Sequence, residues 1–248
     1  MKPNVLILRA PGTNCDMETA FAFEKAGASS EKIHINRLLE DPAILDRFQI
    51  LCFPGGFSFG DDIAAGRVLA NQVRHRLAEP MARFRENQKL ILGICNGFQI
   101  LVKSGILLAD EPEGPPATLT WNNSGIYTDR WADLVVQGNK CVFLKGIEKM
   151  YLPVAHAEGK FVARSEAILD RLEKNGQLAL RYAEGSNPNG AVRNVAGVCD
   201  ESGLVLGLMP HPERHIDYTQ HPRWTRMKKS GDEGDGFAIF KNAVEFFR

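Results

Sequence analysis

The sequence lacks an excess of charge of either sign, a long apolar run and any closely paired cysteines. Lys and Arg number 30, and Asp and Glu also number 30, so the formal net charge is zero. A chain without net positive charge has no general attraction to nucleic acid or to an anionic membrane, and we expect neither as a partner. No stretch approaches the roughly 18 apolar residues that a membrane span requires.

Targeting and redox signals are also missing. The first apolar run, Val5–Leu8, stops at Arg9 and is too short for a signal peptide, which predicts a cytoplasmic protein. The cysteines are odd in number, scattered and never arranged as CxxC. We therefore expect reduced thiols, and neither a disulfide framework nor a metal site. The cysteines are Cys15, Cys52, Cys95, Cys141 and Cys199.

Apolar runs alternate with helical patterns through the first half of the chain. The runs are continuous rather than alternating, which is typical of a parallel sheet covered on both faces. Asp16 is the expected N-cap of the first helix. The predicted strands are Val5–Leu8, Lys32–Asn36, Phe48–Phe53 and Lys89–Ile94, and the predicted helices are Asp16–Ala26, Asp62–Asn87 with an interruption around Pro80, and Phe98–Lys103.

The second half alternates apolar and polar residues, which predicts antiparallel strands laid against the parallel core. Tyr218–Gly236 is polar and is predicted to be a mobile loop. We find no repeat and no clear linker, so we expect one domain over residues 1–248. Its predicted fold is α/β, with a mostly parallel central sheet, helices on both faces and an antiparallel β extension. The predicted strands here are Ile126–Thr128, Leu134–Gln137, Cys141–Leu144, Tyr151–His156, Gln177–Glu184 and a hairpin of Val195–Cys199 with Leu204–Met209, and the helices are Glu166–Lys174 and Phe237–Arg248.

The clearest chemical motif is Gly93-Ile-Cys95-Asn-Gly97, which stands between an apolar run and a helical pattern. A strand, a tight turn and a helix around a Cys or Ser form a nucleophile elbow. Glycines at 93 and 97 avoid the clashes that side chains would cause, and the helix N-terminus favours a thiolate. Cys95 is therefore a predicted nucleophile, and the alternative is a buried cysteine between two ordinary turn glycines.

A second motif, Met209-Pro-His211-Pro-Glu213, follows directly on an apolar strand. A residue before proline is restricted to extended backbone, and in extended backbone residues i and i+2 point the same way. His211 and Glu213 can then lie side by side, so that the carboxylate orients the imidazole. With Cys95 they are predicted to form a Cys-His-Glu catalytic triad.

The third motif, Pro54-Gly-Gly-Phe-Ser-Phe-Gly-Asp-Asp62, follows the predicted strand that ends at Phe53. Adjacent glycines allow backbone N–H groups to approach a substrate closely. We expect an oxyanion hole formed by an N–H of Gly56 or Phe57 and by that of Asn96, the residue after the nucleophile. No Lys-Ser or Lys-Thr follows, so a nucleotide-phosphate loop is disfavoured, whereas a plain turn stays an alternative.

Together and in this order, the three motifs resemble those of the class I, triad-type glutamine amidotransferases. Finer motifs resemble the branch of that family that serves purine biosynthesis, and the matching stretches span nearly the whole chain. They are Arg9–Asp16 with Glu18, Pro54–Asp62, Gly93–Gln99, His156–Gly159, Asn187–Gly190 and Gly207–Arg214.

This resemblance implies a glutaminase that hydrolyses glutamine through a thioester on Cys95, with Gly55 and Gln99 in contact with the bound glutamine. It further implies that the ammonia passes to a large synthetase subunit, which converts formylglycinamide ribonucleotide to the amidine, and that a small accessory subunit completes the complex. ATP and Mg²⁺ are then expected on the synthetase partner, and no cofactor or metal is expected on this chain.

Two other functions stay open. The chain could be a stand-alone hydrolase of another amide or γ-glutamyl bond, or a non-enzymatic binding module on the same fold, although the complete triad argues against the latter. His156 and Glu158 could form a second acid–base pair, but a loop that docks on a partner or contacts glutamine is favoured. We interpret Asn14–Asp16 as a helix cap rather than a site, and Cys52 as an inert core residue.

Overall fold

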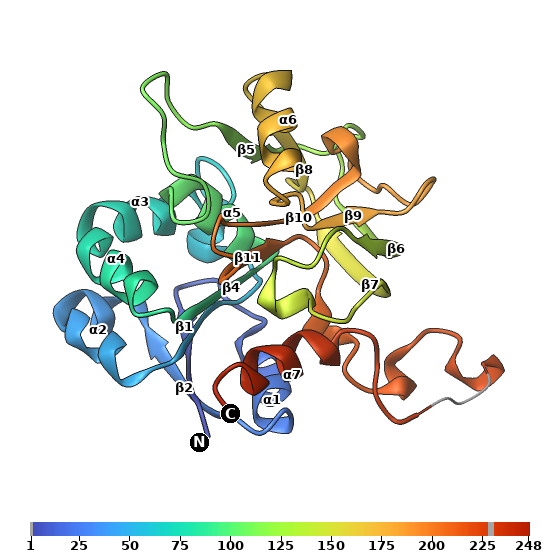
Figure 1. Ribbon diagram of the computed structural model, residues 1–248, viewed down its shortest axis with the longest axis horizontal. Helices are drawn as coiled ribbons and strands as arrows, with labels where there is room; N and C mark the ends of the chain where they lie inside the picture. The colour runs from blue at the N-terminus through green and yellow to red at the C-terminus, as the bar shows by residue number, and fades with distance from the viewer. Residues whose placement is uncertain (1, 228–230) are drawn as a thin grey trace.

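The computed structural model describes residues 2–227 and 231–248. Within this part of the chain, one nine-stranded sheet runs through the molecule in the order β2-β1-β3-β4-β11-β10-β9-β6-β7 (Figure 1). The first five strands in this order are parallel, and all but the edge strand β2 are almost completely buried, as a sheet covered on both faces requires. They are β2 (Ser29–His34), β1 (Asn4–Arg9), β3 (Ile50–Phe53), β4 (Leu90–Ile94) and β11 (Val205–Leu208).

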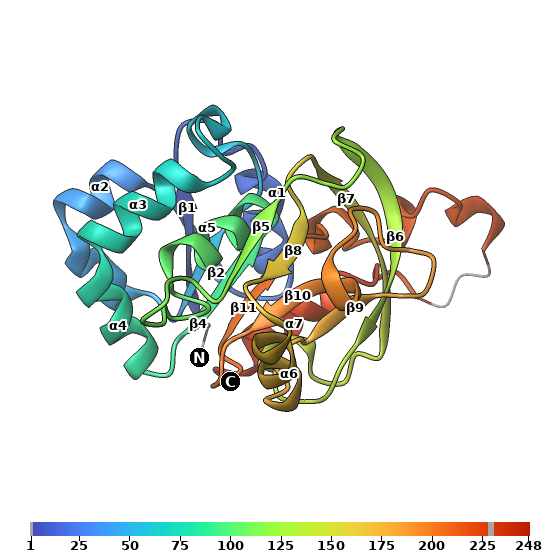
Figure 2. The same ribbon diagram turned by 90° about the horizontal axis from the view of Figure 1, so that it is seen from above.

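The sheet changes direction at β11. This strand pairs in parallel with β4 but antiparallel with β10, and the strands beyond β10 are antiparallel as well. Figure 2 shows this antiparallel half beside the parallel half, with a separate two-stranded sheet of β5 and β8 near α5 (Asn96–Ser104). The added strands are β10 (Val195–Cys199), β9 (Leu180–Tyr182), β6 (Thr128–Val136), β7 (Lys149–His156), β5 (Ala117–Thr120) and β8 (Lys160–Ala163).

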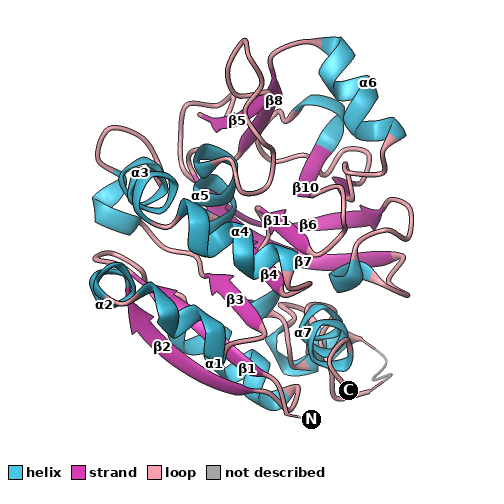
Figure 3. Cartoon of the chain, turned by 60° about the vertical axis from the view of Figure 1, so that its left-hand side comes forward, coloured by secondary structure: helices cyan, strands magenta, loops and turns pink. Residues whose placement is uncertain are grey.

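Helices cover both faces of the parallel half, as predicted (Figure 3). One face carries α1 and α7, which meet through an edge-to-face contact of Phe23 and Phe240 with ring centroids 4.9 Å apart. The other face carries α3, α4 and α5, while α2 lies at the β2 edge and α6 beside β8. The bounds are α1 (Asp16–Lys25), α2 (Ile35–Glu40), α3 (Arg67–Arg76), α4 (Ala78–Glu86), α6 (Glu166–Lys174) and α7 (Phe237–Glu245). In the described residues, no helix has both the length and the apolarity to cross a membrane.

Several predicted elements differ from the observed ones. The predicted helix over 62–87 is two helices that begin only at Arg67 and break at Leu77. Pro80 lies in the first turn of α4, where its missing N–H costs no hydrogen bond. The predicted strand Cys141–Leu144 is a 3-10 turn instead, because the Asn242 side chain on α7 binds the carbonyls of Phe143 and Lys145.

Other boundaries shift. Strand β2 begins at Ser29 and gives way to helix at Ile35, and β9 is shorter than predicted. The separately predicted 126–128 and 134–137 strands are one strand, β6. Cys15, not Asp16, is the N-cap of α1, and the Asp16 carboxylate pairs with Arg9 at 2.9 Å.

The predicted loop Tyr218–Gly236 is held in place over most of its described length. The Tyr218 hydroxyl lies 2.9 Å from the carbonyls of Trp224 and of Met227, and Asp217 caps the turn that begins at Tyr218. Residues 228–230 of this prediction lie outside the described residues.

The contact between α1 and α7 gives a direct test of the core. We expect Phe23→Ala to lower the free energy of unfolding by about 3–5 kcal/mol, because it removes a fully buried ring and its edge-to-face partner. The control is Phe21→Ala on the same helix, where the ring is 55% exposed and the expected change is within about 0.5 kcal/mol. Urea denaturation of the two variants measures the difference, and equal losses would contradict this packing.

Candidate active site

The predicted nucleophile elbow is present at the end of β4. Cys95 has the positive φ of 51° that a strained turn residue adopts, and it caps the N-terminus of α5. The two positions that flank Cys95 have no room for a side chain, so both must be glycine. A Cβ on Gly97 would lie 1.9 Å from the carbonyl oxygen of Phe53, and one on Gly93 would lie 2.5 Å from Leu101 Cδ1. The backbone thus holds Cys95 at the carboxyl edge of the parallel strands.

His211 and Glu213 lie together directly after β11. His211 Nδ1 and Glu213 Oε1 are 2.6 Å apart, and both side chains are almost completely buried. The backbone N–H of His211 donates to the carbonyl of Pro153 on β7, which anchors the turn. Nε2 of His211 is buried and, among the described residues, has no hydrogen-bond partner, so it is available to a reacting group.

The charge on His211 is set by opposing effects. Burial by itself lowers the pKa of this imidazole, but the Glu213 carboxylate and the Cys95 sulfur outweigh burial and hold the pKa well above its ordinary value. The geometry therefore favours a charged imidazole held by the Glu213 carboxylate beside the Cys95 sulfur, an arrangement that suits nucleophilic catalysis.

The loop after β3 lies beside the elbow but differs in part from its predicted role. The N–H of Phe57 donates to the carbonyl of Gly12 at 3.0 Å, so this amide is already occupied. Gly56 has a φ of 140° and packs against the backbone of residues 12–14, where a side chain does not fit. Among the described residues the N–H of Gly56 has no partner, so this amide, unlike that of Phe57, is free to donate to a bound group.

The Asn96 side chain connects this loop to α5. Its Oδ1 accepts the N–H of Ser58 at 3.1 Å, and its Nδ2 lies 3.0 Å from Asp61 Oδ1 and 2.9 Å from Gln99 Oε1. The backbone N–H of Asn96 has no acceptor within the helix, because it belongs to the first turn of α5. Asn96 thus supports the loop with its side chain and leaves its backbone N–H free to donate.

The two predicted glutamine contacts are placed differently. Gln99 lines the cavity at Cys95, but both ends of its amide are bound within the protein, to Asn96 and to the carbonyl of Glu158. Gly55 packs against the His211 ring and does not line the cavity, since a Cβ there would lie 2.8 Å from His211 Cε1. Gly55 therefore leaves room for the imidazole, and its contact with glutamine stays a prediction.

Cys95 opens into a cavity of about 240 Å³. Its walls come from the loop after β3, the start of α5, the residue that follows β5 and the end of β7. This is the carboxyl edge of the parallel strands, where ligands of open α/β sheets bind. The lining residues are Gly56, Phe57, Gly60, Asp61, Ala65, Cys95, Gln99, Trp121, Ala155, His156, Ala157 and Glu158.

His156 lines the cavity at Cys95, a position compatible with the predicted loop that docks on a partner or contacts glutamine. Its Nδ1 lies 3.2 Å from Asn122 Oδ1, and its buried Nε2 has no partner among the described residues. Burial, and then the charge of His211, lowers the pKa of His156 to about 4, so this ring is neutral where His211 is charged. Its position at the end of β7 was visible in the sequence, but its burial was not.

Cys15 was interpreted only as part of a helix cap, yet it lies against the triad. The Arg214 guanidinium donates to Cys15 Sγ at 3.1 Å, and ligand atoms of Cys15, His211 and Glu213 lie within 4.8 Å of one another. In the described residues this is the one such group that could ligate a metal. The guanidinium beside the sulfur opposes a cation there, and burial raises the pKa of the Cys15 thiol.

Comparison with known proteins places this chain in a family. The sequence matches the CobB/CobQ-like glutamine amidotransferase domain over residues 2–247. Two relatives carry the name phosphoribosylformylglycinamidine synthase subunit PurQ. The protein from Dehalococcoides mccartyi is 50% identical, covering 100% of this chain and 98% of its own length. The protein from Archaeoglobus fulgidus is 39% identical, covering 98% and 96%.

Solved structures agree with this placement. A chain in the structure of PurLQS from Thermotoga maritima is 33% identical, with a TM-score of 0.79 and full coverage of both chains. A glutamine amidotransferase from the same organism has a TM-score of 0.54 at 16% identity, covering 91% of this chain and 82% of its own, and shows likeness of fold alone.

Replacing the carboxylate partner of His211 tests the charge balance of the site. In Glu213→Gln we expect the pKa of His211 to fall, because burial is then no longer offset by a negative charge. In the unchanged protein, the stability contributed by protonated His211 is present at low pH and is lost as the pH rises through the raised pKa, and this loss should disappear in the variant. NMR titration of the His211 ring measures the shift. Glu18→Gln, which alters only a neighbour of Arg214, is the control, and an unchanged His211 titration in Glu213→Gln would contradict the assignment.

Proposed function

Because the chain belongs to the family of CobB/CobQ-like glutamine amidotransferase domains, we propose that Cys95, His211 and Glu213 are the residues with which it hydrolyses glutamine. The chain is a glutaminase subunit of phosphoribosylformylglycinamidine synthase, which acts in purine biosynthesis. The observation that carries the residue assignment is the buried 2.6 Å contact of His211 with Glu213, next to a cysteine held in a nucleophile elbow.

The reaction proceeds through two proton transfers at His211. Cys95 Sγ attacks the carboxamide carbon of glutamine, and the proton of the thiol passes through Nε2 to the leaving nitrogen, so that ammonia departs and a thioester remains. Water then attacks the thioester and gives a proton to Nε2, and the C–S bond breaks to release glutamate and restore the thiol. Glu213 keeps the ring oriented and stabilises its charged form in both steps.

The tetrahedral intermediates carry a negative oxygen that needs donors. The backbone N–H groups of Gly56 and Asn96 are proposed for this role, because both belong to segments beside Cys95 and neither is committed elsewhere in the described structure. Phe57 is not used as a donor, since its N–H is bound to Gly12. Gln99 acts by holding Asn96 and Glu158 in place.

The released ammonia is used by the partners of this chain. It associates with a large synthetase subunit, together with a small accessory one, in an ATP-using complex. We place ATP and Mg²⁺ on the synthetase, which performs the amidine-forming step. Apolar side chains exposed at the cavity mouth support docking there: Phe57 is 42% and Trp121 58% exposed, and Tyr127 packs on Phe57.

Two broader assignments accompany this function. We propose that residues 1–248 act as a single amidotransferase domain, supported by a family match over nearly the whole chain and by a sheet that continues through both halves.

We place the protein in the cytoplasm, supported by five cysteines that are all free thiols. A stand-alone hydrolase of another amide is not favoured, because relatives over the full length are synthase subunits.

The nucleophile is tested with a diazoketone analogue of glutamine in the assembled complex. We expect a single adduct on Cys95, mapped by peptide mass spectrometry and blocked by glutamine. Cys95→Ala should lose the adduct and lower the glutamine-dependent rate by at least about 10³-fold, while leaving the rate with added ammonia unchanged. Cys199→Ala is the matched control. An adduct elsewhere, or none in an assembled complex, would remove Cys95 from this role.

The cavity mouth is tested by association. We expect Trp121→Ala to weaken binding to the synthetase and accessory subunits by about 30-fold, as truncation of an aromatic anchor commonly does. Trp224→Ala is the control. Trp224 is 43% exposed but does not line the cavity at Cys95, so this variant should bind normally. Analytical ultracentrifugation measures both, and equal binding of all three proteins would show that the mouth is not the docking surface.

A further inference from the structure

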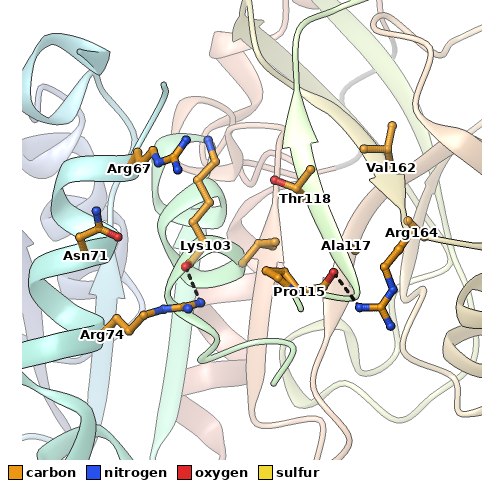
Figure 4. Close-up of a pocket in the computed structure, with 11 residues that line it drawn as sticks. Arg67, Asn71, Arg74, Lys103, Pro115, Ala117, Thr118, Val162 and Arg164 are labelled. Carbon is orange, nitrogen blue, oxygen red and sulfur yellow. Dashed lines mark hydrogen bonds between the residues drawn. The ribbon is translucent and has the colours of Figure 1, made fainter. Parts of the chain in front are cut away.

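A second cavity, of about 470 Å³, lies between α3, α5 and the two-stranded β5–β8 sheet (Figure 4). Its volume falls within the range of about 300–1,000 Å³ that small-molecule sites occupy. It shares no lining residue with the cavity at Cys95, so it is a separate place on the molecule. The lining residues are Arg67, Asn71, Arg74, Val102, Lys103, Pro115, Ala117, Thr118, Val162, Ala163 and Arg164.

The charged side chains that line this cavity are all positive. It contains four cationic side chains and no carboxylate, in a chain whose total charge is zero. Two of the cations are neutralised from outside the cavity: Arg74 by Asp110, and Arg164 by Glu111 and Glu113. Of the other two cations, Lys103 has a looser ion pair with Glu158, at 3.8 Å, and Arg67 has none among the described residues.

Arg67 and Lys103 meet at one end of the cavity (Figure 4). The Arg67 guanidinium has no ion-pair or hydrogen-bond partner among the residues that the structure describes. Lys103 Nζ donates to the carbonyl of Ala65 and lies 3.8 Å from a carboxylate oxygen of Glu158. Burial, and less strongly Arg67 itself, lowers the pKa of Lys103, so the two cations repel each other in the free protein.

A group with two negative charges would relieve this repulsion and pair with both side chains. Guanidinium and ammonium groups are the common ligands of phosphate. The Asn71 amide and the Thr118 hydroxyl also line this cavity. The rest of the lining includes an apolar surface for the organic part of a ligand, formed by Val102, Ala117 and Val162. We propose that this cavity binds a phosphate monoester of mononucleotide size, with Arg67 and Lys103 on its phosphate.

The same lysine links this cavity to the glutamine site. Lys103 lies one turn after Gln99 on α5, and its Nζ binds Ala65, a wall residue of the Cys95 cavity. Glu158 receives the Ala65 N–H on its carboxylate and the Gln99 amide on its carbonyl. A phosphate that draws Lys103 toward Arg67 therefore loosens two contacts of the glutamine site, so occupancy of the second cavity should alter reactivity at Cys95. Only this linkage rests on the proposed function, since binding itself needs no catalysis.

Binding is tested by calorimetric titration of the full chain with ribose 5-phosphate, with ribose as the uncharged comparison. We expect binding of the phosphate ester only, weakened by added salt and reduced about tenfold or more in Arg67→Ala. Asn71→Asp, which places a carboxylate in the cavity, should reduce it as well. Arg76→Ala, on the same helix but outside the lining, should bind normally, as should Cys95→Ala.

The outcomes separate the alternatives. No binding, equal binding of ribose, or full binding by both Arg67→Ala and Asn71→Asp would overturn the site. If these variants instead lose only the synthetase subunit, the cavity is a protein contact and the proposal fails. For the linkage, we expect saturating ribose 5-phosphate to change the rate of diazoketone labelling of Cys95 at least twofold in the unchanged protein and not in Arg67→Ala. An unchanged rate despite binding would overturn the linkage and leave the glutaminase assignment intact.

Discussion

The chemistry of this chain depends on how closely the start of α5 approaches the end of β3. The carbonyl oxygen of Phe53 occupies the space where any side chain at position 97 would begin, so the elbow and the loop after β3 are forced together. The Asn96 side chain then joins them by accepting from Ser58 and donating to Asp61. As a result, the free N–H groups of Gly56, in the loop after β3, and of Asn96, at the start of α5, are held in place near Cys95 before any substrate enters.

The two histidines near Cys95, His156 and His211, differ in charge. His211 is almost completely buried, and the Glu213 carboxylate and the Cys95 sulfur make its charged form favourable. His156 has no carboxylate partner among the described residues, and burial together with the charge on His211 keeps it neutral. Similar burial therefore leaves one ring charged and the other neutral, and the difference lies in the carboxylate and the sulfur beside His211.

The sequence predicted those features that depend on local backbone rules. The elbow, the alignment of His211 with Glu213 and the parallel order of the first strands follow from glycine spacing, proline restrictions and continuous apolar runs, and all three are present. Features that depend on long-range contacts were not predicted. Phe57 loses its donor to Gly12, the 142–144 turn is held by Asn242, and Cys15 reaches the triad only because α1 packs beside the turn after β11. No local pattern encodes which distant carbonyl or guanidinium completes such a contact.

Strand β11 belongs to both halves of the sheet, so the site lies across the boundary between them. Cys95 follows β4, inside the parallel half, whereas His211 follows the boundary strand and is also bound to β7 through the carbonyl of Pro153. A small rotation of the antiparallel half about this boundary would carry the imidazole with it and leave the sulfur behind. The distance between the His211 ring and Cys95 therefore depends on how the two halves of the sheet are held relative to each other.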